Sequence, residues 1–190
     1  NELDYIVPNI PNITVTTIPI NSVKARYFVN YKQYDKALAL LNEGTFANPY
    51  LFYSEVLKSQ IYQEKGQLDG AKVYAKKAFF GLPNNDLHTS RYLHLISITK
   101  DRNALDEAFE TLTFNNKINN WKNYLIVASN LYPRGDLNLK KKAEIALKNF
   151  PNNQDFINLY RQIVVGQTGF NDASEYSKKG LKYFNEMDYQ

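Results

Sequence analysis

The fold of this chain is decided by residues 70–83, which read GAKVYAKKAFFGLP. Residues 36–49, which lie 34 positions earlier, read KALALLNEGTFANP and show the same small residues and closing proline. The matched positions are Ala37 with Ala71, Gly44 with Ala78 and Pro49 with Pro83. Small residues at helical spacing, followed by a proline that cannot continue a helix, indicate a helix packed closely on its neighbours.

The period of 34 residues continues along the chain. The closing proline returns at Pro151, and small residues return in phase at Ala146, Ala173 and Gly180. A period of about 20 to 50 residues is typical of solenoids, in which each repeat buries its apolar face only against its neighbours. The sequence therefore predicts an all-α fold of five repeats. Their predicted ranges are 18–51, 52–85, 86–119, 120–153 and 154–187.

Each repeat is predicted to contain two helices joined by a short turn. In the second repeat, apolar residues recur at helical spacing over residues 53–62, and the sequence GQLD at 66–69 then interrupts the pattern. In the third repeat the alanine of the second helix is displaced to Ala108, which predicts a longer turn. Asp35 and Asp69 fall near the start of the second helices, where a side chain can cap free N–H groups.

Residues 1–17 differ in kind from the repeats. Pro8, Pro11 and Pro19 interrupt short β-branched stretches. Because proline lacks the backbone donor and biases the preceding residue toward extended conformations, this segment is predicted to be an extended arm. Residues 188–190 are predicted to form a short tail.

These features resemble the tetratricopeptide repeat (TPR), a helix–turn–helix unit of 34 residues. The first two repeats match it at four positions, which are Ala25 and Ser59, Phe28 and Tyr62, Ala37 and Ala71, and Pro49 and Pro83. The later repeats match mainly in period, since Leu105 and Leu139 replace the alanine that opens the second helix. The resemblance implies a right-handed helical-hairpin superhelix that binds a peptide or protein segment on its concave face.

The resemblance also implies which side chains line that concave face, since it is built mainly from the first helix of each repeat. The expected residues are Arg26, Tyr53, Gln60, Arg91, His94, Trp121 and Tyr124. Arginine and aromatic residues supply much of the binding energy at protein interfaces. For Tyr53, Trp121 and Tyr124 the sequence leaves an alternative open, which is packing between adjacent repeats.

The sequence shows no arrangement of residues that is typical of an enzyme. The two histidines, His88 and His94, are six residues apart and fall on different helix faces, unlike the i, i+4 pair that binds zinc. We expect His88 on the surface and His94 lining the groove or packed beside it. The chain has no cysteine, no Gly-x-Ser-x-Gly elbow and no phosphate-binding glycine loop. We therefore expect a non-catalytic protein with no metal and no cofactor.

The charge of the chain is only moderately basic, with a formal net charge of +4 and a pI near 9.0. Its 18 lysines and 5 arginines are scattered along the sequence. Nucleic-acid-binding proteins more often gather these residues on one stripe. We therefore expect no nucleic-acid partner.

Two functional hypotheses follow. The first is a scaffold that binds a peptide or protein segment. The second rests on a weaker resemblance, in which the arm and the Asn- and Tyr-rich repeats look like the soluble TPR tails of bacterial O-antigen ligases or polymerases. That hypothesis implies membrane association through a segment upstream of Asn1, and a periplasmic or membrane-associated location, while a cytoplasmic one stays open.

Overall fold

The computed structural model describes residues 16–113 and 117–187, and within these ranges the chain forms nine α-helices. The same residues contain no β-strand beyond an isolated bridge at Pro19. Most of the predicted arm and the predicted tail lie outside the described residues. The helices are α2 (Ile20–Asn30), α3 (Tyr34–Ala47), α4 (Tyr53–Glu64), α5 (Leu68–Gly81), α6 (Asp86–Thr99), α7 (Arg102–Leu112), α8 (Ile118–Leu131), α9 (Leu137–Asn149) and α10 (Gln154–Met187).

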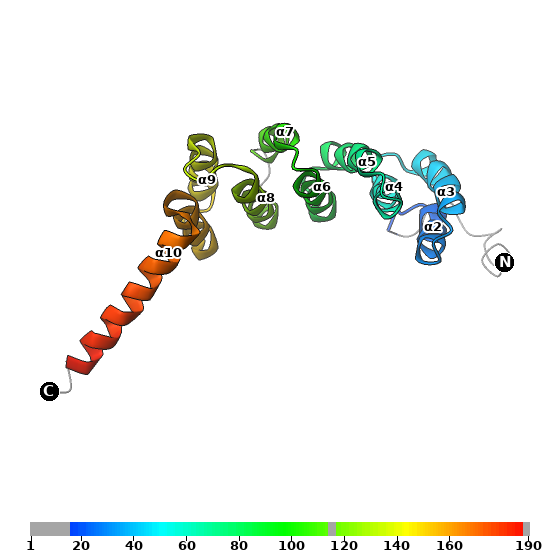
Figure 1. The fold of residues 1–190 in the computed structure, drawn as a ribbon. Helices are drawn as coiled ribbons and strands as arrows, with labels where there is room; N and C mark the ends of the chain where they lie inside the picture. Colours follow the sequence, from blue (N-terminus) through cyan, green and yellow to red (C-terminus); the bar gives the residue numbers. More distant parts are fainter. Residues whose placement is uncertain (1–15, 114–116, 188–190) are drawn as a thin grey trace. The chain divides into compact units, whose positions relative to one another are not determined.

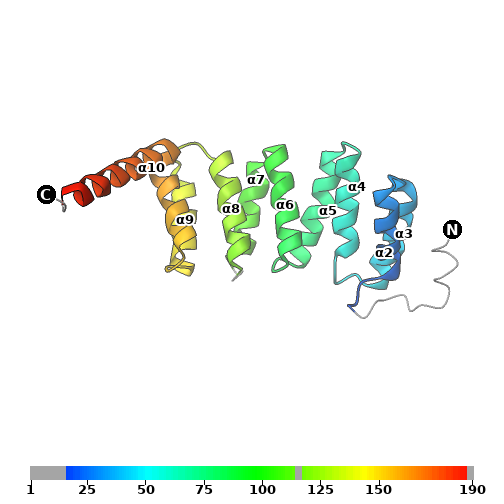
Figure 2. The same ribbon diagram turned by 90° about the horizontal axis from the view of Figure 1, so that it is seen from below.

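Consecutive helices pair as antiparallel hairpins (Figure 1 and Figure 2). Three residues separate α2 from α3 and α4 from α5, two separate α6 from α7, and the helices of each pair contact each other. The chain divides into two compact units, Asn1–Asn120 and Trp121–Gln190. The predicted all-α helical-hairpin fold is confirmed. The right-handed superhelical arrangement of the hairpins stays a prediction.

The period of 34 residues is carried by the turns inside the first three hairpins. Lys32, Gly66 and Lys100 stand 34 positions apart, and their φ angles are 56°, 72° and 51°. In each turn the N–H of the next residue donates to a carbonyl five residues earlier, as Gln67 does to Tyr62 at 2.8 Å. This is the Schellman arrangement, in which a left-handed residue ends the helix. Glycine adopts that conformation without strain, yet only the second of these hairpins has one.

This turn geometry corrects the prediction of a longer turn in the third repeat. The turn at Lys100 has the same hydrogen bonds as the two before it, so α7 begins in phase with α3 and α5. Ala108 is fully buried, and so is the in-phase Leu105. The displaced alanine is therefore an additional core residue and does not signal a shifted turn.

Small residues hold the helices of the first compact unit close together. Ala37, Ala71 and Ala78 are fully buried, as their phase in the sequence predicts. Gly44 in α3 is also buried, and a Cβ added there would lie 2.3 Å from the Ser22 hydroxyl oxygen. Helix axes approach this closely only where side chains are small.

The predicted helix caps are wrong by one or two positions. Asp35 and Asp69 lie in the first turns of α3 and α5, and the N-cap residues of these helices make no side-chain capping hydrogen bond. Side-chain caps occur instead at Asn85, Asp101 and Asp136, which accept from first-turn N–H groups of α6, α7 and α9. Both aspartates still lie where a negative charge favours a helix N-terminus.

The fifth repeat departs most from the pattern. Gly166, at φ 77° and ψ 160°, interrupts α10 and divides it into two helical segments. Ala173 and Leu181, which are in phase with buried positions of earlier repeats, are exposed. The last segment therefore does not bury its side chains in the way that the earlier second helices do.

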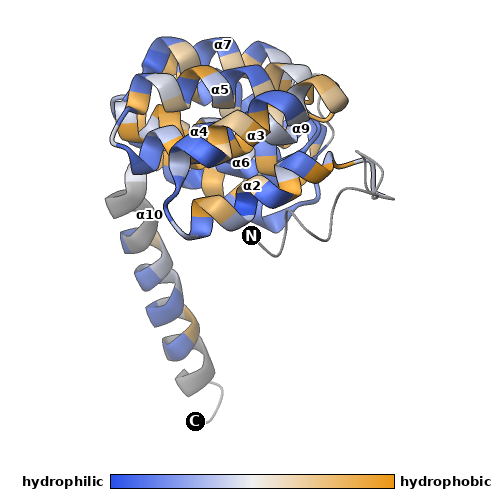
Figure 3. Cartoon of the chain, turned by 90° about the vertical axis from the view of Figure 1, so that its right-hand side faces the viewer, coloured by the Kyte–Doolittle hydropathy of each residue, from blue (hydrophilic) through white to orange (hydrophobic). Residues whose placement is uncertain are grey.

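Figure 3 shows hydrophilic and hydrophobic residues side by side on the helices of the hairpins. Such mixed helices bury one side and leave the other to solvent. Along the described residues, no helix combines the length and the apolar character needed to cross a bilayer.

His88 is buried, which corrects the prediction of a surface histidine. Only 2% of its surface is exposed, and its Nδ1–H donates to the Ala78 carbonyl at a distance of 3.1 Å. Burial lowers the pKa of His88, while the bond to Ala78 and the nearby Glu55 carboxylate act in the opposite direction. The neutral imidazole therefore joins the first turn of α6 to the C-terminal end of α5.

The close helix contact at Ala71 can be tested by adding volume. Ala71→Leu is expected to lower the free energy of unfolding by about 1–3 kcal/mol, because a buried leucine overpacks the contact. Chemical denaturation measures the change. Ala39→Leu is the matched control, since Ala39 is an exposed alanine on α3. Equal stability of both variants would show that Ala71 does not limit helix approach.

His88 is expected to make folding less favourable in mild acid. Its pKa is lowered in the folded state, so the unfolded chain takes up the proton first as the pH falls below about 6.5. The stability that neutral His88 supplies is present above that pH and is lost as the pH falls through the folded-state pKa.

His88→Gln keeps a donor for the Ala78 carbonyl and removes the titration. The free energy of unfolding, measured by denaturant titration at several pH values below 7, should therefore fall less steeply than in the parent chain. His94→Gln is the matched control, because it removes the other histidine and retains His88. Parallel pH profiles for the parent chain and His88→Gln would contradict this account.

Candidate functional site

The candidate surface lies on first helices of the hairpins in the first compact unit, and α4 and α6 form its centre. Gln60 and Arg91 are half-buried there, and His94 is exposed. Arg26 is exposed on α2, one helical turn before Asn30. Four of the seven predicted residues therefore present surface on first helices.

Two polar contacts join α6 to α4. The Nε–H of Arg91 donates to the Ser59 hydroxyl oxygen at 3.0 Å, and the Gln63 amide nitrogen lies 3.3 Å from Nε2 of His94. Ser59 and Gln63 are one turn apart on α4, and the same holds for Arg91 and His94 on α6. Both contacts therefore lie along one side of this helix pair.

A carboxylate that sequence reasoning missed completes this surface. Glu64 accepts hydrogen bonds from the Gln60 amide and from the Tyr34 hydroxyl, both at 2.8 Å. The bond to Glu64 raises the pKa of Tyr34. Tyr34 lies 30 positions from Glu64, so no periodic pattern of the sequence could pair them. We call Gln60, Gln63, Glu64, Arg91 and His94 the α4–α6 face.

Arg91 is the unusual member of the α4–α6 face. Its Nη2 atom is buried and has no hydrogen-bond partner within the described part of the chain. Burial lowers the pKa of Arg91, and the negative charge of Glu64 partly opposes that effect. A guanidinium nevertheless stays protonated in proteins. The α4–α6 face therefore contains a fixed positive charge that is partly removed from water and has an unused donor.

An open hollow adjoins this charge. It has a volume of about 470 Å³ and is lined from three helices and a turn. Its lining residues are Val29, Asn30, Lys32, Tyr34, Gln60 and Glu64. The hollow combines an apolar residue, two amides, a cation and a carboxylate, which suits a ligand with several hydrogen-bonding groups.

The three aromatic candidates belong to the packing alternative. Tyr53 packs against the core cluster of α2, α3 and α4, which includes Ala25, Leu41 and Leu57. Trp121 and Tyr124 are each 0% exposed. A fully buried ring offers a ligand no surface, so these two residues are removed from the candidate site. The sequence pattern could not separate the alternatives, because buried and groove-lining aromatics occur at the same helical phase.

The described residues contain no group of three or more His, Asp or Glu side chains that could hold a metal ion. On the α4–α6 face, His94 is paired with an amide and Glu64 with an amide and a phenol. These are hydrogen-bonding groups that can recognise a ligand. They do not form the pairing of a nucleophile with a base that covalent catalysis needs.

The burial of Trp121 leads to a stability prediction. Trp121→Ala is expected to lower the free energy of unfolding by about 3–5 kcal/mol, because the truncation leaves a large cavity. Leu137→Ala is the matched control, since Leu137 is 72% exposed on α9. Thermal and chemical denaturation of both variants measure the difference. A small effect at Trp121 would return this residue to the candidate site.

No protein-family model matches the chain, and no curated protein sequence matches it either.

Proposed function

We propose that this chain is a non-catalytic scaffold that binds an extended peptide segment of a protein partner on the α4–α6 face. The observation that supports it is Arg91, whose charge is partly desolvated and whose Nη2 donor is unused. An unsatisfied buried donor costs about 1–3 kcal/mol. A carboxylate or carbonyl oxygen brought by a ligand offsets that cost once the guanidinium turns toward it.

The neighbouring groups favour a peptide as the source of that oxygen. Gln60, Gln63 and His94 have amide and imidazole groups that donate to and accept from peptide N–H and C=O groups. These side chains come from two packed helices, so their spacing is held by the fold, and pre-organisation lowers the entropy cost of binding. The expected ligand is an extended segment with an acidic side chain opposite Arg91.

The second hypothesis, a soluble tail of a bacterial membrane glycan ligase or polymerase, stays a prediction. Its test is the sequence that precedes Asn1 in the gene. Several long apolar spans there would favour it.

The peptide proposal is tested with a phage-displayed library of short random linear peptides selected against the whole chain. We expect enriched peptides to contain an acidic residue. Their affinity for Arg91→Ala should be about 30-fold lower, corresponding to the roughly 2 kcal/mol of an interface hot spot. Fluorescence anisotropy with the labelled peptides measures the affinities.

Arg161→Ala is the matched control, because Arg161 is an exposed arginine on α10. Melting temperatures of both variants show whether the fold is retained, and Arg91→Gln serves in place of Arg91→Ala if the alanine variant unfolds. The proposal is wrong if no peptide is enriched, or if the enriched peptides bind the Arg91 variants as tightly as the parent chain.

A further inference from the structure

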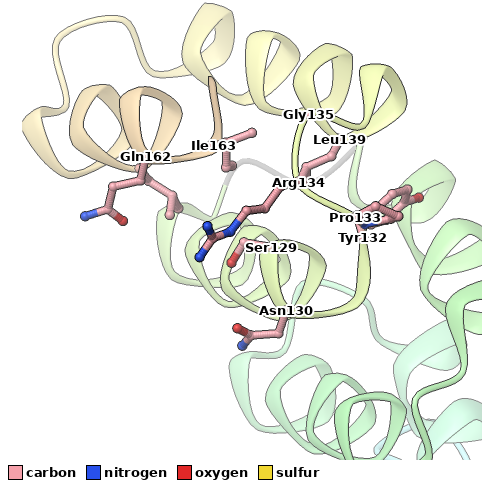
Figure 4. A pocket seen from close by; sticks show the side chains of 10 residues that line it. Ser129, Asn130, Tyr132, Pro133, Arg134, Gly135, Leu139, Gln162 and Ile163 are labelled. Atoms are coloured by element: carbon pink, nitrogen blue, oxygen red, sulfur yellow. The ribbon is translucent and has the colours of Figure 1, made fainter. Parts of the chain in front are cut away.

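A second candidate site lies in the second compact unit, away from the residues of the α4–α6 face. It is a pocket of about 290 Å³ formed by α8, the α8–α9 turn, α9 and α10 (Figure 4). Ser129, Asn130, Arg134 and Gln162 supply its polar side chains. In Figure 4 the Arg134 side chain extends across the pocket, and its guanidinium lies beside Ser129.

The charge of the pocket is positive. Arg134 is the one ionisable side chain among the residues described as lining it, and no carboxylate is among them. Within the described residues, the guanidinium makes no ion pair and no hydrogen bond. A guanidinium with all its donors available binds a carboxylate through two parallel hydrogen bonds.

The backbone that carries Arg134 is fixed on both sides. The Asp136 N–H donates to the Pro133 carbonyl at 3.2 Å, which closes a four-residue turn with Arg134 and Gly135 at its centre. Gly135 has φ 77°, the left-handed conformation that a type II turn requires at this position. The Asp136 side chain then caps α9 by accepting from Asn138 and Leu139. The turn therefore presents Arg134 with little conformational entropy left to lose.

The opposite wall of the pocket is apolar. Leu139 comes from α9, and Leu159 and Ile163 come one turn apart from α10. A volume of about 290 Å³ lies at the lower end of ligand sites, which span about 300–1,000 Å³, so the pocket suits a small group. A ligand that satisfies both walls has an acidic head and a short aliphatic chain.

We propose that this pocket binds a carboxylate attached to a short aliphatic chain, with Arg134 holding the carboxylate and Leu139, Leu159 and Ile163 holding the chain. Two sources present this chemistry, a free aliphatic acid and the end of a polypeptide whose last residue is aliphatic. In the second case the Ser129 oxygen and the amides of Asn130 and Gln162 are available to the last peptide groups. The Ser129 hydroxyl already donates to the Ile126 carbonyl, so its oxygen serves as an acceptor.

The test is a heteronuclear NMR titration of the whole chain with hexanoate, hexanamide and acetate. We expect hexanoate to shift the amide resonances around the pocket in a saturable way. Hexanamide lacks the charge and should bind at least roughly tenfold more weakly, in line with hydrogen bonds to charged groups. Acetate lacks the chain and should also bind more weakly.

Arg134→Gln should weaken hexanoate binding by a similar factor and leave the melting temperature unchanged, because Arg134 is exposed and unpaired in the described chain. Arg161→Gln, which changes an arginine of α10 outside the pocket, should bind hexanoate like the parent chain. Equal binding of hexanoate and hexanamide, equal binding by Arg134→Gln, or no saturable shift would overturn the proposal.

A further arm separates the two sources. An acetylated peptide ending in a free leucine carboxylate is titrated beside the same peptide with an amidated end. Tighter binding of the free-ended peptide than of hexanoate supports a polypeptide end as the ligand. Tighter binding of hexanoate supports a free acid.

Discussion

The first compact unit depends on one close contact, in which the backbone of α3 lies against α2 and α4 at Gly44. A Cβ at this position would lie 2.3 Å from the Ser22 hydroxyl and 3.0 Å from that of Ser54, and these two hydroxyls are themselves 2.8 Å apart. A single residue thus fixes the distance between two successive first helices. The equivalent contact in the next hairpin is Ala78, whose carbonyl accepts from His88 on α6. The spacing of α2, α4 and α6 follows from these contacts.

The sequence predicts what repeats and fails where partners are not periodic. Helices α3, α5 and α7 begin at Tyr34, Leu68 and Arg102, so the period of 34 holds in the structure. Left-handed turn residues follow the same period, although two of three are lysines that sequence reasoning could not identify as turn residues. The capping residues were misplaced because an aspartate can lie before a helix or in its first turn with a similar electrostatic benefit. His88 was misplaced because its burial depends on a carbonyl of the preceding helix.

The candidate site was predictable only in part. Helical phase places Gln60, Arg91 and His94 on first helices, but it gives neither their partners nor their burial. The pairs Arg91–Ser59 and Gln63–His94 join residues 31 or 32 positions apart, close to one period. Ser59 had been interpreted as a small packing residue, and it fills that role while its oxygen accepts from Arg91. One period therefore sets both the packing and the polar contacts between neighbouring first helices.

Helix α4 connects these observations, because its residues 54–59 are all buried. An amphipathic helix on a surface buries one face, so six consecutive buried residues require neighbours on every side. Among them are Glu55, which accepts from Lys77 at 3.2 Å and from Thr45 at 3.3 Å, and Lys58, whose pKa burial lowers. Unpaired, such groups would be strongly destabilising, so α3 and α5 must supply partners to α4 in one fixed arrangement. Binding groups are held most accurately on rigid elements, and the α4–α6 face is built on the most constrained helix of its compact unit.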